Sequence, residues 1–312
     1  MIDDLDDVIL KVNHKLKELE KEYIQQFDKP EGPVFFIVGA PRSGTTLLLQ
    51  TIINHFHIGY INNFIAKFWE APVIGSILFK SLGEFKPELA YHSEGGFTGE
   101  IYGPHEFGYF WRGYFNYGET HALSESDHRK IDVLSLTREI AGLESIQGKP
   151  LVFKNPAALS LQIDFLAKYI PNSYFIYIRR DPFYIAQSLY LKRLEKFKDP
   201  GAWYSVKPAM YTHLIHKSPA GQIAGQVFYT IKKMEYDLSS LSPDRFFTLD
   251  YEKFCRHPDL TLGECQDLMK YKRKDTMRKL ATLTFEVNNQ VQIDPEKEQE
   301  LRSNLSELDS SI

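Results

Sequence analysis

The sequence has only two cysteines, Cys255 and Cys265, among its 312 residues. Two thiols cannot build a disulfide framework, and no histidine pattern beside them matches the spacing of a zinc site. Two reduced cysteines are typical of a protein from a reducing compartment. With 43% apolar residues, the chain is long enough to bury a full core in one large or two small domains.

Long apolar runs are also missing, and neither sign of charge is in large excess. No segment approaches the roughly 18 apolar residues of a membrane span, and residues 1–7 are acidic where a signal peptide would be basic. We therefore expect a cytoplasmic protein without a transmembrane segment. The 37 basic and 41 acidic residues give a net charge of −4, so we expect no nucleic-acid partner. A site for an anionic ligand must then be built locally.

Residues 33–50, PVFFIVGAPRSGTTLLLQ, predict such a local site. The apolar run 34–38 is typical of a strand buried on both faces of a parallel sheet, and Gly39 ends it. A tight loop over 40–44 follows, and a helix is expected from Thr45. Strand, turn and helix N-terminus together aim backbone N–H groups and the positive end of the helix dipole at one point, which favours phosphate.

The spacing of this loop differs from the nucleoside-triphosphate loop G-x-x-x-x-G-K-S/T at one position. Gly39, Gly44 and Thr46 match that motif, but Thr45 stands where the lysine should be, and the cation lies inside the loop as Arg42. Without the lysine, a magnesium-bound triphosphate is a poor fit. Amides, hydroxyls and one cation suit a shorter phosphate group and require no metal.

This pattern resembles the 5′-phosphosulfate loop of the sulfotransferases, which use 3′-phosphoadenosine 5′-phosphosulfate (PAPS) as donor. The version at 41–46, Pro-Arg-Ser-Gly-Thr-Thr, is similar to that of tyrosylprotein sulfotransferases and many bacterial members. Cytosolic sulfotransferases usually have lysine in the place of Arg42. The resemblance implies that the donor is bound by Arg42, Ser43, Gly44, Thr45 and Thr46.

Two later strands are also expected to end in cations. The apolar run 151–153 is followed by Lys154, and 174–178 is followed by Arg179 and Arg180. Short strand–helix–strand links indicate parallel strands with right-handed crossovers, and ligands gather at the carboxyl ends of such strands. We therefore predict an α/β fold, a P-loop-type three-layer domain with a central parallel sheet flanked by helices. Its edge should bring three cations together: Arg42, Lys154 and Arg180.

Arg180-Asp181-Pro182, with Ser188 eight residues after Arg180, resembles the 3′-phosphate motif of the sulfotransferases. Arginine offers a forked, charge-assisted grip, and Ser188 lies two turns along the following helix. Tyr251-Glu252 resembles the family's "YE" element, which implies that Tyr251 lies against the adenine. The family usually adds a basic C-terminal contact; Lys270, Lys272, Arg273 and Lys274 are candidates, but no glycine pattern fixes their register and we assign none.

The resemblance implies in-line transfer of a sulfuryl group from PAPS to a hydroxyl, or less favourably an amine, with 3′-phosphoadenosine 5′-phosphate as product and no metal required. Arg42 and the loop amides would stabilise charge on the bridging oxygen. Lys154 matches the lysine after the family's middle strand and would hold the sulfuryl oxygens.

The residues at the two positions where the family carries its general base differ in this chain. Cytosolic sulfotransferases carry Lys-Thr-His where this chain has Lys154-Asn155-Pro156, and Asn62-Asn63 stands near the place of the tyrosylprotein enzymes' glutamate. His105 is the first candidate base and Glu106 the second, because they are titratable groups in the glycine- and aromatic-rich stretch 83–120, which we expect to line the acceptor site. Glu70 is the third candidate, and a readily ionised acceptor that needs no base is a further option.

One domain is expected over residues 31–290, with two loops inside it and a flanking segment at each end. The glycine- and aromatic-rich stretch 83–120 and the stretch 192–219 are expected to be loops at the substrate site. Such loops suit a small-molecule, lipid or glycan acceptor. Residues 291–312 are a polar C-terminal helix or tail. Residues 1–30 form an amphipathic helix that packs on the domain or, less favourably, makes a homodimer contact. Its apolar face comprises Leu5, Val8, Val12, Leu16, Leu19 and Tyr23.

Two other functions stay open. A P-loop kinase of a small metabolite requires Mg²⁺ ligands and a cation near the γ-phosphate, and Thr45 argues against it. If the protein were a non-catalytic nucleotide-binding module used for interaction, we would expect the donor-binding residues to be replaced. Those residues are all present, but the acceptor side leaves this reading open because the base is unassigned.

Overall fold

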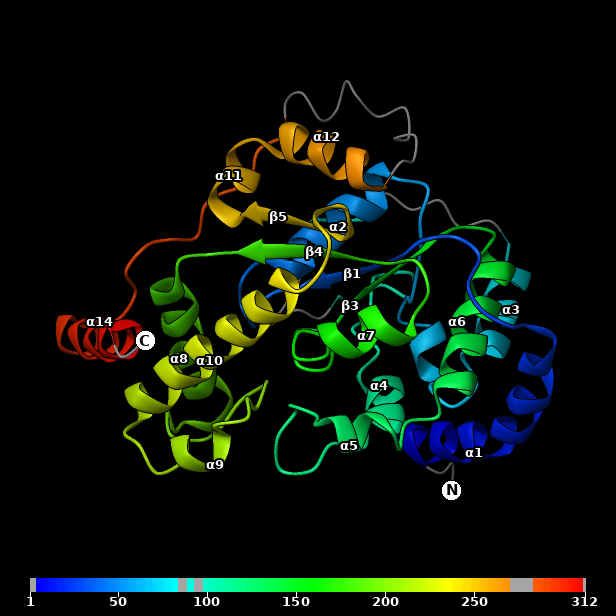
Figure 1. Cartoon of the computed structure of the whole chain (residues 1–312), viewed down its shortest axis with the longest axis horizontal. Helices are drawn as coiled ribbons and strands as arrows, with labels where there is room; N and C mark the ends of the chain where they lie inside the picture. Colours follow the sequence, from blue (N-terminus) through cyan, green and yellow to red (C-terminus); the bar gives the residue numbers. More distant parts are fainter. Residues whose placement is uncertain (1–3, 84–88, 93–97, 270–282, 311–312) are drawn as a thin grey trace.

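The computed structural model describes residues 4–83, 89–92, 98–269 and 283–310. Within these ranges the centre is a five-stranded, wholly parallel sheet in the order β2-β3-β1-β4-β5 (Figure 1). This arrangement confirms the predicted α/β fold. The strands are β1 (Val34–Val38), β2 (Gly59–Tyr60), β3 (Leu151–Lys154), β4 (Ser173–Arg179) and β5 (Phe246–Asp250).

The central strands bury both faces, as their unbroken apolar runs predict. On one face Phe36 of β1 stacks between Phe153 of β3 and Phe175 of β4, with ring centroids 5.8 and 5.7 Å away. The parallel register places these three residues side by side. On the other face Phe35 and Ile37 join a separate apolar cluster. The sheet therefore stands between two cores.

Helices cover both faces and complete three layers (Figure 1). One face carries α2 (Thr45–His55), α11 (Tyr251–Arg256) and α12 (Pro258–Met269). The other carries α4 (Gly108–Phe115), α6 (Val133–Gln147), α7 (Ile163–Tyr169), α8 (Pro182–Phe197) and α10 (Pro219–Ser239). Shorter elements are η1 (Ile24–Gln26), η2 (Ile65–Lys67), α5 (Glu125–His128), α9 (Tyr211–Leu214) and η3 (Pro243–Arg245). The helix α3 (Pro72–Ser81) packs on α6.

The N-terminal helix α1 (Leu5–Tyr23) forms where it is predicted but docks through a different face. Leu5 and Leu19, on the predicted apolar face, are 64% and 52% exposed. The buried carboxylate of Glu20 instead accepts hydrogen bonds from the backbone N–H groups of Val73 (2.7 Å) and Ile74 (3.0 Å). These amides belong to the first turn of α3 and have no partner within it, so they require a hydrogen-bond acceptor such as the Glu20 carboxyl group.

Part of the predicted substrate loop 83–120 is helical. Helix α4 lies within it, and its rings Phe110 and Trp111 are 2% and 0% exposed. Trp111 meets Phe153 of β3 edge to face, at 5.3 Å between ring centroids. Phe110 and Trp111 therefore belong to the core, and the assignment of the rest of the stretch to the substrate site stays a prediction.

The second predicted loop, 192–219, and the C-terminal segment also contain helix. Helix α8 continues to Phe197 and α9 occupies 211–214, which leaves 198–210 without regular structure. The C-terminal helix α14 (Pro295–Ser310) packs against α8 and α10 and buries Leu301 completely. The segment predicted as a polar helix or tail is thus a docked helix, with Leu301 buried and Leu305 partly buried against the core.

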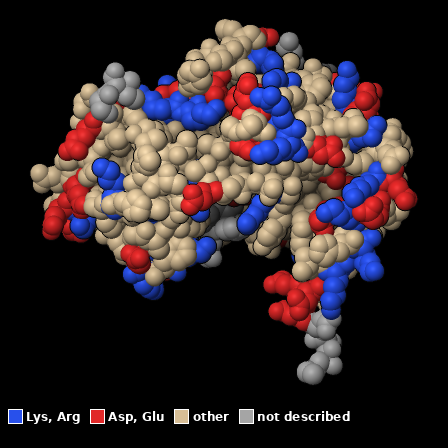
Figure 2. Space-filling model, turned by 60° about the horizontal axis from the view of Figure 1, so that its bottom comes forward, with Lys and Arg blue, Asp and Glu red and all other residues tan. Residues whose placement is uncertain are grey.

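Basic and acidic side chains are interspersed over the face of the molecule seen in Figure 2. This agrees with the nearly balanced charge of the sequence. Within the described ranges, no helix combines the length and apolar character needed to cross a membrane.

Candidate active site at the carboxyl ends of the strands

The loop between β1 and α2 is held in an unusual backbone conformation. Gly44, which precedes α2, has φ 98°, and a Cβ placed there would lie 2.6 Å from the ring of Tyr251. Arg42 also has a positive φ, 72°. The buried hydroxyl of Ser160 pins the start of the loop, since it donates to the carbonyl of Gly39 (2.9 Å) and accepts from its N–H (3.1 Å). A strained loop held by its surroundings is a common feature of ligand sites.

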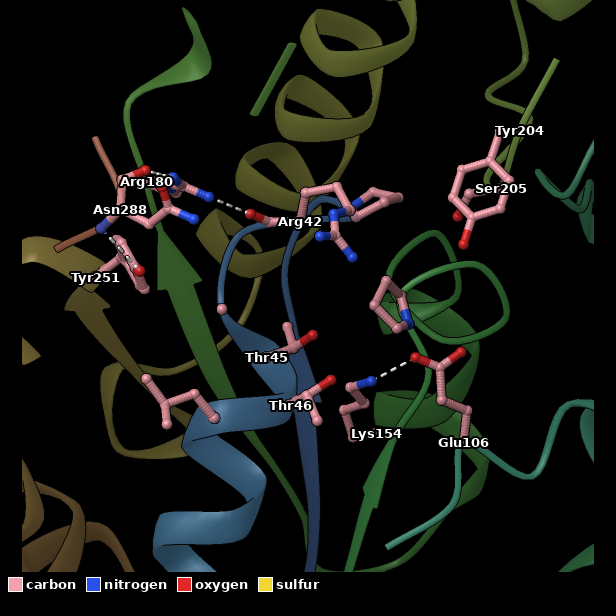
Figure 3. Close-up of a pocket in the computed structure, with 14 residues that line it drawn as sticks. Arg42, Thr45, Thr46, Glu106, Lys154, Arg180, Tyr204, Ser205, Tyr251 and Asn288 are labelled. Carbon is pink, nitrogen blue, oxygen red and sulfur yellow. Dashed lines mark hydrogen bonds and ion pairs between the residues drawn. The ribbon is translucent and has the colours of Figure 1, made fainter. Parts of the chain in front are cut away.

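A cavity of about 210 Å³ opens above this loop. It lies at the carboxyl ends of β1, β3 and β4, and the predicted cations Arg42, Lys154 and Arg180 all line it (Figure 3). The other predicted residues that line it are Gly44, Thr45, Thr46, Glu106 and Tyr251. The structure therefore brings together one loop and two later strand ends that are far apart in the sequence.

The guanidinium of Arg180 is fixed on several sides. It donates from Nη1 to the carbonyl of Arg42 (2.7 Å), from Nε to the side-chain oxygen of Asn289 (3.1 Å) and from Nη2 to the carbonyl of Asn288. It also lies over the ring of Tyr251, 4.6 Å from the centroid. Burial lowers the pKa of Arg180 from its ordinary value. The charge is held in place before any ligand arrives.

Lys154 and Glu106 form an ion pair at the opposite end of the cavity (Figure 3). The lysine side chain is 2% exposed and the glutamate 30%. A buried ammonium group is costly without a partner, and Glu106 is the carboxylate that meets it. Because Glu106 is partly open to the cavity, it can contact both Lys154 and a bound molecule.

His105, the first candidate base, does not line the cavity as the described residues define it. Its Nδ1 accepts a hydrogen bond from the backbone N–H of Phe107 (2.9 Å), and burial lowers its pKa. Glu70 does not line the cavity either, and pairs with Lys17 of α1 at 2.6 Å. Only Glu106 of the three candidates faces the three cations.

Two predicted donor contacts, Ser43 and Ser188, lie beside the cavity without lining it. The hydroxyl of Ser43 is fully buried and has no hydrogen-bond partner among the described residues. Ser188 accepts a hydrogen bond from Nε of Arg42 (3.0 Å). In this structure Ser188 orients the loop arginine, which is a different contact from the predicted one.

Tyr204, Ser205 and Asn288 line the cavity but escaped the sequence analysis. They come from segments without regular structure, 198–210 and 283–294. No spacing in the sequence signals their position, because long-range contacts such as Asn288 with Arg180 set it. The basic residues considered for the C-terminal contact, at 270–274, lie outside the described residues.

Comparison with known proteins places this chain in a family. Residues 33–272 match the model of the sulfotransferase family. No curated protein matches the chain. The matched span includes the loop after β1 and both later strand ends.

Solved structures agree with the fold. A sulfotransferase from Mycobacterium avium aligns over 96% of this chain and 76% of its own, with a TM-score of 0.55 and 15% identity. A sulfotransferase from Mycobacterium tuberculosis H37Rv aligns over 93% and 81%, with a TM-score of 0.54 and 13% identity. At such identity the likeness concerns the fold.

The chain belongs to the sulfotransferase family, because the family model covers most of its length. It is therefore an enzyme of the class that transfers sulfate groups, as the sequence predicts.

Proposed function

We propose that this protein transfers a sulfuryl group from PAPS to a hydroxyl, or less favourably an amine, of a small-molecule, lipid or glycan acceptor. The observation that carries the proposal is the convergence of Arg42, Lys154 and Arg180 on one cavity. Three cations beside a helix N-terminus attract a ligand with several negative charges. PAPS carries such charges at two separated positions, its 3′-phosphate and its 5′-phosphosulfate.

The arrangement in Figure 3 supports one orientation of the donor. Arg180 and Tyr251 stand at one end of the cavity and suit the 3′-phosphate and the adenine. Arg42, Thr45 and Thr46 stand between the ends and suit the 5′-phosphate. Lys154 and Glu106 stand at the other end, where the sulfuryl group would meet the acceptor.

Glu106 is our choice of general base, in place of His105. In the proposed reaction the acceptor oxygen forms a bond to sulfur and gives its proton to the Glu106 carboxylate, while the sulfur–oxygen bond to the 5′-phosphate breaks. Lys154 stabilises the sulfuryl oxygens in the transition state, and Arg42 with the loop amides stabilises the charge left on the phosphate oxygen. No covalent intermediate on the protein is needed.

Calorimetric titration with 3′-phosphoadenosine 5′-phosphate tests the donor site, with 5′-AMP and magnesium ATP titrated for comparison. We expect metal-independent binding that requires the 3′-phosphate and is lost in Arg180→Ala. The control is Arg179→Ala, whose side chain is half exposed and pairs with Asp250 outside the cavity. Equal binding of 5′-AMP, or a preference for magnesium ATP, would contradict the proposal and favour a kinase.

A further inference from the structure

A second cavity, of about 270 Å³, lies next to the proposed donor site. Three basic residues line it: Arg112 of α4, His121 and Lys207. Its other lining residues are neutral and include Asn155 and Gly108, the first residue of α4. Among the described residues, its wall thus holds cationic and neutral groups but no carboxylate.

The two permanent cations of this cavity lack an ionic partner in the described part of the chain. No ion pair there involves Arg112 or Lys207, and the Nζ of Lys207 lies over the ring of Tyr211, 4.5 Å from its centroid. Some surface cations nearby in the chain do pair, as Arg129 does with Glu125 and Lys130 with Asp127. Unpaired cations beside a cavity leave their charge available to an anion.

His121 is built into the same wall by two backbone contacts. Its N–H donates to the carbonyl of Lys207 (2.8 Å), and its Nδ1 accepts from the N–H of Lys207 (3.1 Å). A neutral imidazole that accepts at Nδ1 carries its proton on Nε2, which is then a hydrogen-bond donor. Burial, and then the neighbouring Lys207 and Arg112, lower the pKa of His121 to about 4. All three basic residues thus lie close together and can donate hydrogen bonds.

The two cavities are neighbours because three chain segments contribute to both. Glu106, Lys154 and Tyr204 line the proposed donor cavity, whereas Gly108, Asn155 and Lys207 line the second one. Consecutive Cα atoms are about 3.8 Å apart, and in each segment the residues on the two walls are only one to three positions apart in the sequence. Asn155 closes the wall between them by a hydrogen bond from its side chain to the carbonyl of Glu106 (3.1 Å).

We propose that the second cavity binds an anionic group of the acceptor, a carboxylate or a phosphate, held by Arg112, His121 and Lys207. This inference rests on the proposed function and adds to it the substrate class: a hydroxyl compound with an acidic group a few ångströms away. Arginine and lysine are the side chains that hold such oxyanions most strongly.

Three matched phenols test this proposal: 4-hydroxyphenylacetate, 4-hydroxybenzylphosphonate and the neutral 4-hydroxyphenylacetamide. Their binding to the full chain is measured by calorimetry, with and without saturating 3′-phosphoadenosine 5′-phosphate. We expect at least one anionic phenol to bind about tenfold more tightly than the amide, a difference typical of one ionic contact. The carboxylate and phosphonate arms show which anion the cavity prefers.

The variants Arg112→Gln and Lys207→Gln should each remove most of this preference and leave binding of the adenosine bisphosphate unchanged. The matched controls Arg129→Gln and Lys130→Gln, whose side chains are exposed and already paired, should keep it. Absence of any preference for the anionic phenols, or a preference that survives both cavity variants, would overturn the inference. Failure of the proposed function shows separately, as absent binding of the adenosine bisphosphate.

Discussion

At the scale of single residues, the ion pair between Lys154 and Glu106 distinguishes the two candidates for the general base. His105 and Glu106 are adjacent in the chain, yet Glu106 meets the buried Lys154 in the cavity, whereas His105 is engaged by the backbone of Phe107. A carboxylate at this place can orient an acceptor hydroxyl and take its proton. The imidazole of His105 has no such position.

We therefore expect Glu106→Gln to lower kcat by roughly 10²- to 10⁴-fold, the usual range for loss of a general base. The loss should be larger for a weakly acidic phenol than for 4-nitrophenol, because a readily ionised acceptor needs less help. His105→Ala should keep kcat within about fivefold of the parent enzyme, as expected for a group outside the reaction. Rates of sulfuryl transfer to the two phenols, at saturating donor, provide the measurement. An equal loss for both phenols would indicate a structural role.

Gly44 is a second residue whose effect can be predicted. An alanine there would keep a strained φ of 98° and would press its Cβ against Tyr251. Gly44→Ala should lower the free energy of unfolding by roughly 1–3 kcal/mol and weaken donor binding. Gly113→Ala is the control, since its Cβ meets nothing within 4 Å in helix α4; it should stabilise by roughly 0.5–1 kcal/mol. Urea unfolding and calorimetry measure both, and normal binding by Gly44→Ala would be contrary to this account.

At the scale of elements, α1, α3, α4 and α6 meet around two buried carboxyl groups. Glu20 of α1 accepts from the first turn of α3, and Glu139 of α6 accepts a hydrogen bond from the hydroxyl of Tyr114 of α4 (2.8 Å). Burial is the main cause that raises the pKa of Glu20 to about 7 and that of Glu139 to about 8. These helices are thus joined by groups that are protonated in weak acid.

This junction predicts that stability falls as pH rises. In the unfolded chain both groups ionise near their ordinary pKa of 4.5, but in the folded chain they keep their protons until about pH 7 and 8. Between about pH 4.5 and pH 8 the folded state therefore binds more protons than the unfolded state, and the free energy of unfolding decreases as the pH rises through this range. The combined decrease is on the order of a few kcal/mol.

Urea unfolding at pH 5.5 and pH 8.5 measures this dependence. Glu139→Gln keeps a hydrogen-bond acceptor for Tyr114 and cannot ionise, so the difference in free energy between the two pH values should shrink. The control is Glu22→Gln, because Glu22 is an exposed residue of the same helix as Glu20. If Glu139→Gln kept the full pH dependence of the parent protein, Glu139 would not be its source.

At the scale of the whole molecule, the site joins parts from nearly the full length of the chain. Arg42 lies near its beginning, Lys154 and Arg180 in its middle, and Asn288 towards its end, on the segment that leads to α14. A ligand that contacts all four binds the folded chain and has no comparable site in the unfolded one. Ligand binding should therefore stabilise the entire fold.

Saturation with 3′-phosphoadenosine 5′-phosphate should accordingly raise the melting temperature. At a concentration about 100-fold above its Kd, a ligand adds about 2.7 kcal/mol of stability, which corresponds to roughly 5 °C for a large domain. Thermal unfolding followed by circular dichroism measures the shift. Arg180→Ala should lose it, Arg179→Ala should retain it, and an equal shift in both variants would argue against Arg180 as a ligand contact.

The sheet and the three cations at its edge could be read from the amino-acid sequence alone. Continuous apolar runs predict buried parallel strands, and the carboxyl ends of parallel strands necessarily meet at one edge. The convergence of Arg42, Lys154 and Arg180 could therefore be predicted without coordinates, as could the loop before α2. These features depend on local pattern and on a general rule of topology.

Three features required the folded structure: the face of α1 that docks, the aromatic residues that enter the core, and the choice between His105 and Glu106 as the residue that faces the cavity. Each depends on contacts between distant segments: Glu20 with the start of α3, Trp111 with β3, and Glu106 with Lys154. Periodicity and spacing carry no information about such partners, because the direction of a side chain in an irregular loop is set by what packs against it. The position of Asn288 has the same origin.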